Sequence, residues 1–123
     1  MGKFLVKEVK TGRRFNLVAG NGEVIGVSEV YASRSGIRNG IASVRKNAPI
    51  APVEDQTVEE VEKVKNPKFE MYIDKAGEYR FRLKARNGEI ILASEGYSQK
   101  AGCKNGIESV RKNAVDSPVV KAE

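Results

Sequence analysis

Apolar and charged residues alternate along segment 79–86 with a period of two, which is the pattern of a strand with one buried face. The dipeptide Asn87-Gly88 follows this segment and predicts a two-residue hairpin turn of type I′. The apolar segment 90–93 then reads as the returning strand, and segment 69–73 as an earlier one. The chain therefore contains a predicted three-stranded meander in its second half.

A helix follows this meander. Apolar residues recur at helical spacing within segment 98–112, which gives the predicted helix one apolar face. Arg111 and Lys112 fall in its last turn, where cations offset the negative end of the helix dipole. Asn113 suits the left-handed residue that commonly follows a helix. A short apolar segment near residue 119 completes the order strand, strand, strand, helix, strand.

The same order occurs earlier in the chain, because the sequence contains an internal duplication. At an offset of 66, residues 13–48 match residues 79–114 at 21 of 36 positions. The first repeat has its own Asn21-Gly22 turn, a helix predicted over about 33–46, and Asn47 in place of Asn113. Internal similarity of this length indicates two copies of one structural unit.

The boundaries follow from composition and charge. We assign residues 1–53 to repeat 1, 54–67 to an acidic linker and 68–123 to repeat 2. Segments 1–48 and 68–114 carry net charges of +6 and +4, whereas segment 49–67 carries −3 and three prolines, which is linker composition. Each repeat is near the lower size limit for independent folding, so we expect the two to share one core.

These features predict an α+β protein in which the tandem β-β-β-α-β repeats form one antiparallel sheet, with both helices packed on one face. Ile37 and Cys103 occupy equivalent positions in the two repeats and should both be buried. The weak three-residue spacing of Val58, Val61 and Val64 leaves open a short helix in the linker.

The string from Tyr97 to Ala114, Y-S-x-K-A-G-x-K-N-G-I-E-S-V-R-K-N-A, resembles the signature of the YegP-like bacterial proteins. These are small domains of unknown function that are often duplicated in tandem. The resemblance covers both repeats, and repeat 1 departs from the string at Ala32, Ile37 and Ala42. It implies a single sheet in which the C-terminal strands are exchanged between repeats, and it implies no activity.

Composition excludes several kinds of chemistry. The 123 residues include no His and one Cys, so neither a Ser-His-Asp nor a Cys-His nucleophile can form within the chain. A zinc site built from Cys and His is excluded in the same way. We therefore predict a protein that is not an enzyme and has no catalytic residues, no cofactor and no metal. The expected function is that of a small interaction or structural module, a monomer with an unknown protein partner and no membrane association.

The alternative is weak, sequence-independent binding of nucleic acid, since the net charge is +6. The candidate contact residues form a basic row along one predicted strand: Arg80, Arg82, Lys84 and Arg86. Repeat 1 lacks this row, and the strand carries no outward aromatic side chain for base stacking. Carboxylates on neighbouring strands, such as Glu70 or Glu89, offer a competing role as ion-pair partners.

Other retained residues have a structural and a functional interpretation. Cys103 reads as a buried apolar residue more readily than as a reactive thiol, because Ile37 is its counterpart. The Gly-x-x-x-Gly spacing at 36/40 and 102/106 predicts close packing, with a cradled ligand as the alternative. Asn39 and Ser43, with Asn105 and Ser109, contact either a partner or the other repeat. The charged N-terminal segment does not match a signal peptide, so we expect a cytoplasmic protein.

Overall fold

The computed structural model describes residues 2–122 and contains eight strands and two helices. The elements of repeat 1 are β1 (Lys3–Val9), β2 (Gly12–Val18), β3 (Val24–Val27), α1 (Arg34–Asn47) and β4 (Val53–Asp55). Those of repeat 2 are β5 (Lys68–Ile73), β6 (Tyr79–Lys84), β7 (Ile90–Ala93), α2 (Lys100–Asp116) and β8 (Val119–Lys121). Met1 and Glu123, the outermost residues of the two predicted repeats, lie outside the described residues.

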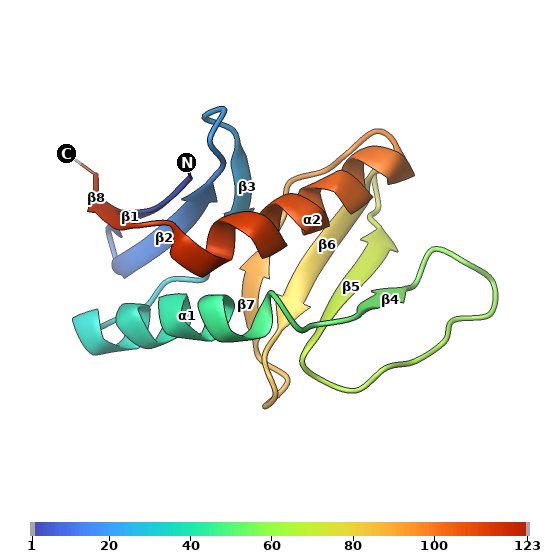
Figure 1. Cartoon of the computed structure of the whole chain (residues 1–123), viewed down its shortest axis with the longest axis horizontal. Helices are drawn as coiled ribbons and strands as arrows, with labels where there is room; N and C mark the ends of the chain where they lie inside the picture. The colour runs from blue at the N-terminus through green and yellow to red at the C-terminus, as the bar shows by residue number, and fades with distance from the viewer. Residues whose placement is uncertain (1, 123) are drawn as a thin grey trace.

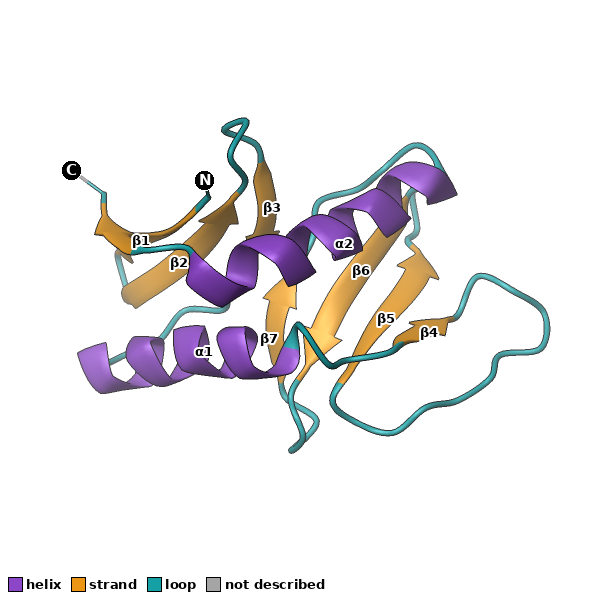
Figure 2. Ribbon diagram, viewed as in Figure 1, coloured by secondary structure: helices purple, strands orange, loops and turns teal. Residues whose placement is uncertain are grey.

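All eight strands form one sheet in the order β4-β5-β6-β7-β3-β2-β1-β8. Both helices cover the same face of this sheet, and the other face is open (Figures 1 and 2). The two repeats meet where β3 pairs with β7 at Val27 and Ala93. The predicted α+β architecture with one shared sheet is therefore confirmed.

The short strand after each helix is exchanged between the repeats. β4 of repeat 1 pairs with β5 of repeat 2, and β8 of repeat 2 pairs with β1 of repeat 1. Both of these pairings are parallel, whereas the six inner strands are antiparallel, so the sheet is mixed and not wholly antiparallel as predicted. The crossover helix explains the difference, because it returns each exchanged strand to the sheet in the direction of its new neighbour.

The register aligns one residue from each strand across the open face. This row runs through Glu54, Glu70, Arg82, Ala93, Val27, Asn16, Leu5 and Val120. Its charged residues, Glu54, Glu70 and Arg82, lie on β4, β5 and β6, and its residues on the other five strands are uncharged. The duplication therefore preserved the backbone while the chemistry of the two half-faces diverged.

The core lies between the sheet and the helices. Ile37 and Cys103 are 4% and 0% exposed, as predicted from their equivalence. Phe15 and Phe81, on the second strand of each repeat, are fully buried. The main-chain N–H of each phenylalanine donates to a serine hydroxyl, that of Ser28 or Ser94, which explains why both repeats retain this serine.

Two local predictions are wrong, each in both repeats. Gly22 and Gly88 have φ values of +88° and +85°, but no residue other than glycine has a positive φ among the described residues, so neither hairpin is a two-residue type I′ turn. In the second hairpin the N–H of Gly88 donates to the carbonyl of Ala85, which instead gives a three-residue loop with glycine in the left-handed position. Asn47 and Asn113 lie inside their helices, where each amide donates to the carbonyl of the serine four residues earlier.

The linker starts later than predicted and contains no helix. β4 extends to Asp55, so the first two residues assigned to the linker belong to the sheet. Residues 56–67 form an irregular loop, which we call the connector, beyond the β4 edge (Figure 1). Neither helix of the described residues is long and apolar enough to cross a membrane.

Candidate functional sites: a neutralised basic strand and a basic cleft

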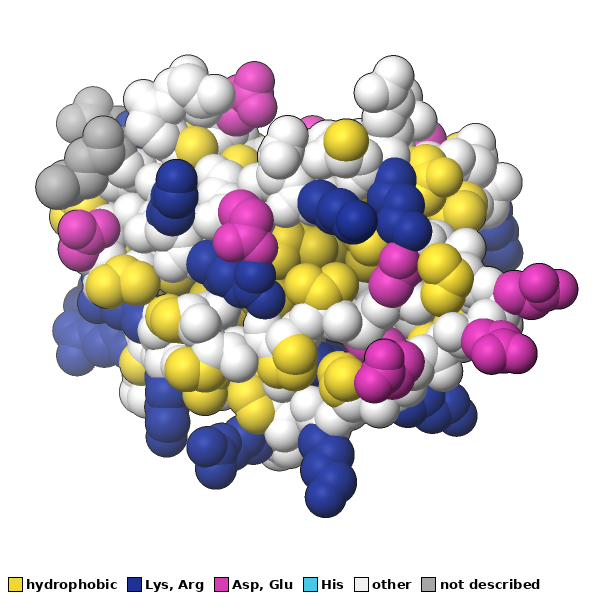
Figure 3. Space-filling view, turned by 45° about the vertical axis from the view of Figure 1, so that its right-hand side comes forward, with side chains coloured by type: hydrophobic (Ala, Val, Ile, Leu, Met, Phe, Trp, Pro, Cys, Tyr) yellow, Lys and Arg dark blue, Asp and Glu magenta, His cyan; other side chains and the backbone are white. Residues whose placement is uncertain are grey.

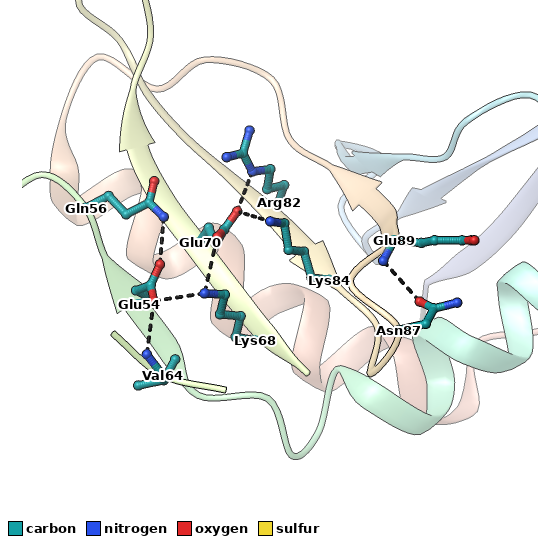
Figure 4. Close-up of polar contacts among 9 residues, drawn as sticks. All are labelled: Glu54, Gln56, Val64, Lys68, Glu70, Arg82, Lys84, Asn87 and Glu89. Atoms are coloured by element: carbon teal, nitrogen blue, oxygen red, sulfur yellow. Dashed lines mark hydrogen bonds and ion pairs between the residues drawn. The ribbon is translucent and has the colours of Figure 1, made fainter. Parts of the chain in front are cut away.

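Three members of the basic row predicted to contact nucleic acid lie on the open face of the sheet and are paired with carboxylates; Figure 4 shows two of them, Arg82 and Lys84. The Arg80 guanidinium lies 2.5 Å from Asp74, and that of Arg82 lies 2.6 Å from Glu70. Lys84 lies 3.3 Å from Glu70. Arg86 is exposed in the hairpin loop after β6 and is not part of the strand. Arg82 and Lys84 thus pair with Glu70 across β5 and β6, as the alternative interpretation of Glu70 predicted, and Arg80 pairs with Asp74 in the turn that follows β5.

Glu70 is the centre of this network and is 4% exposed. Burial raises the pKa of its carboxyl group, but hydrogen bonds from Arg82 and Lys84 outweigh burial and hold that pKa below its usual value. Lys68 bridges Glu70 to Glu54, its ammonium lying 2.9 Å from the Glu54 carboxylate. The hydrogen bond from Lys68, with a second from Gln56, lowers the pKa of Glu54 to about 2. These carboxylates therefore remain charged and neutralise the cations around them.

The strand that carries the basic row has no outward aromatic side chain, but the neighbouring strand β5 supplies one, Tyr72. The Arg82 guanidinium sits 4.7 Å from the centre of the Tyr72 ring. Tyr72 is two residues after Glu70 on β5, so both share the open face. Period-two alternation along β5 indicates that Glu70 and Tyr72 share a face. The register between β5 and β6 then places the Tyr72 ring beside Arg82.

A different surface holds four cations, of which three have no carboxylate partner among the described residues. A cleft of about 320 Å³ lies between α1 and the edge formed by β1 and β8. Its apolar lining is Val6, Ile37, Ile41 and Val119, and its charged lining is Arg13, Arg34, Arg38, Lys121 and Glu8. We call this surface the basic cleft. Among the described residues, the one ion pair on it joins Arg13 to the exposed Glu8 at 3.6 Å.

The equivalent place on the repeat 2 side of the sheet contains a carboxylate that the basic cleft lacks. Tyr79 replaces Arg13 and packs against the core. Asp55 replaces Lys121, and its carboxylate lies 2.7 Å from Lys100, the counterpart of Arg34. Burial raises the pKa of Asp55, but the hydrogen bond from Lys100 is among the contacts that bring it below its usual value. Strand exchange thus places a carboxylate of β4 beside repeat 2, at the position where β8 places a fourth cation beside repeat 1.

The remaining sequence candidates have structural roles. Burial, together with Asp55, raises the pKa of the Cys103 thiol to about 11, which disfavours the reactive thiolate. A side chain at Gly40 or Gly106 would overlap the hydroxyl of Tyr31 or Tyr97, so these two glycines allow the tyrosine rings to lie on the helices. The Ser43 and Ser109 hydroxyls accept hydrogen bonds from the asparagine one turn later in the same helix.

Comparison with known proteins agrees with the duplication. The family model "Domain of unknown function (DUF1508)" matches residues 11–55 and again residues 74–120. The chain is 39% identical over 122 residues to the UPF0339 protein YegP of Yersinia pestis, covering 98% of this chain and 95% of that protein. It is 73% identical over 48 residues to a UPF0339 protein of Stutzerimonas stutzeri, less than half of whose length (43%) is spanned.

A solved structure has the same fold. The solution structure of yegP from E. coli, described as a protein of unknown function, superposes with a TM-score of 0.80 at 33% identity. The match covers 98% of this chain and 91% of that one. The chain therefore belongs to the DUF1508 family of YegP-like proteins and carries the family's domain twice.

Proposed function

We propose that the protein is a non-catalytic interaction module, and that its basic cleft binds an acidic segment of a protein partner. The observation that carries this proposal is the exchange of Asp55 for Lys121 between equivalent positions of the two repeats. On the repeat 1 side of the sheet, four cations and the exposed Glu8 surround an apolar floor, and the carboxylate that stands at the equivalent position on the repeat 2 side is absent. A partner that brings both carboxylates and apolar side chains would complete the site.

The chemistry of the cleft suits binding better than catalysis. Guanidinium groups remain protonated in proteins, so Arg13, Arg34 and Arg38 can hold an anion but cannot exchange protons with a substrate. They also pair with carboxylates in a planar, two-bond geometry, which favours acidic side chains. Apolar contact with Val6 and Val119 adds an attraction that persists when salt screens the charges.

The charge distribution over the whole molecule keeps the basic cleft away from the protein's own acidic segment. Acidic side chains project where the connector and β4 lie, at the right of the view in Figure 3. The basic cleft lies at the opposite edge of the sheet, beside β8. The connector therefore cannot neutralise this cleft within one chain.

The test uses a peptide with the sequence of residues 56–62, Gln-Thr-Val-Glu-Glu-Val-Glu, blocked at both ends. Calorimetric titration at about 50 mM salt should show that the protein binds this peptide. The double variant R34E/R38E should bind it with an affinity at least about tenfold lower. The matched control is K104E/K112E, which removes the same charge from exposed positions on α2. Equal loss in both variants would show attraction by net charge alone and would overturn the proposal.

A further inference from the structure

The two edges of the sheet differ in how they are protected. β8 forms one edge, and all three of its residues are exposed, with Val119 at 51% and Val120 at 38%. Within residues 2–122, no strand pairs with its outer side. An unprotected edge strand presents free N–H and C=O groups to any other extended segment.

The inner hydrogen bonds of β8 identify which groups are free. The N–H of Phe4 donates to the carbonyl of Pro118, and the N–H of Ala122 donates to the carbonyl of Val6, both at 2.8 Å. Alternate residues of a strand face opposite neighbours, so the main-chain groups of Val119 and Lys121 point away from β1. These same two residues line the basic cleft with their side chains.

At the other edge, the connector lies beside β4. The N–H of Val64 donates to the Glu54 carboxylate at 3.0 Å (Figure 4). A cleft of about 320 Å³ beside β4 is lined by Val53 and Asp55 and by four residues of the connector, Val58, Glu60, Glu62 and Val64. An irregular segment that carries valine and glutamate therefore lies beside β4 without pairing with it, at the place equivalent to the bare side of β8.

We infer that the acidic partner segment binds in an extended conformation and adds a ninth strand along the outer side of β8. This inference rests on the proposed function of the basic cleft. The added strand would hydrogen-bond to the main chain of Val119 and Lys121. Every second side chain would then face the helix side of the sheet, within reach of Arg34 and Arg38. Main-chain pairing supplies affinity, and the cations of the basic cleft select acidic side chains.

The closing experiment separates main-chain pairing from charge. Two versions of the 56–62 peptide are N-methylated at alternate residues, one set at positions 57, 59 and 61 and the other at 58, 60 and 62. N-methylation removes N–H donors and keeps every side chain. Alternate N–H groups of an added strand face β8. One methylated peptide should therefore bind at least about tenfold more weakly than the unmodified peptide, and the other should keep an affinity close to that of the unmodified peptide.

A second measurement reports from the protein side. Hydrogen exchange followed by NMR should show the amides of Val119 and Lys121 slowed at least about tenfold in the complex with the unmodified peptide. The variant Val119→Pro removes one outward N–H without removing a bond to β1, and should weaken binding of the unmodified peptide.

The outcomes distinguish the two proposals. Equal binding of all three peptides with unchanged exchange at Val119 and Lys121 would overturn strand addition and leave charge-selective binding in place. Failure of the unmodified peptide to bind would overturn both.

Discussion

The guanidinium of Arg45, on α1, donates a hydrogen bond of 2.6 Å to the carbonyl of Ser117, which lies 72 residues later at the end of α2. Arg111 on α2 makes the equivalent 2.6 Å bond to the carbonyl of Ala51. Each guanidinium also lies over the phenylalanine of its own first strand, Phe4 or Phe69. The two arginines therefore fasten each helix to the chain segment that leads into the other repeat's exchanged strand.

Removal of Arg45 should weaken the junction between the repeats. We expect Arg45→Ala to lower the free energy of unfolding by about 1.5–3 kcal/mol, because a hydrogen bond from a charged group is lost and the Ser117 carbonyl is left without it. Urea unfolding measures this, with Lys112→Ala at an exposed position as the control. A loss no larger than that of the control would show that the arginine does not fasten the repeats.

Two glycines of α2 should respond in opposite ways to alanine. In Gly106→Ala the new methyl group would overlap the Tyr97 ring and approach Phe81, so the variant should be destabilised. In Gly102→Ala the new methyl group meets only Tyr97 at ordinary contact distance, so the variant should gain up to about 1 kcal/mol from helix propensity. Thermal unfolding of the pair tests the packing role, and equal effects would contradict it.

Glu54 should account for part of the stability that the protein loses at acidic pH. Its pKa of about 2 in the folded protein lies below the usual value of 4.5, so its contribution is fully present above about pH 4.5. That contribution is lost as the pH falls from 4.5 towards 2. We expect Glu54→Gln to be less stable at pH 7 and to lose less further stability over this interval. Glu59→Gln, at an exposed position, is the control, and parallel acid limbs for all three proteins would contradict the assignment.

The basic row should contribute little to binding of duplex DNA. Free phosphate contacts at Arg80 and Arg82 would lower the slope of log K against log salt by roughly two when both become Gln. Because Asp74 and Glu70 already neutralise them, we expect a change well below one, together with reduced stability. K3Q/K7Q, on the repeat 1 half of the same face, is the comparison. A drop of two in the first double variant would restore the basic row as a nucleic-acid site.

Local pattern was sufficient to predict the repeats, the helices and the burial of Ile37 and Cys103. It placed β5 and β6 in one meander but did not give the register between them, so the pairing of Arg82 with Glu70 stayed one of two interpretations. Local pattern could not predict the basic cleft either, because Lys121 reaches it only through the exchange of β8 onto β1. The difference between Lys121 and Asp55 is visible in the aligned repeats, but its meaning depends on which strand each one joins.

Charge exchange across the basic cleft tests the central claim most directly. The R34E/R38E variant is titrated with the 56–62 peptide and with a version in which Glu59, Glu60 and Glu62 are replaced by Lys. We predict that the variant loses the acidic peptide and binds the basic one more tightly than the unmodified protein does, while K104E/K112E does not reverse the preference. A preference for the acidic peptide that survives R34E/R38E, or an equal reversal in both variants, would contradict a binding site in this cleft.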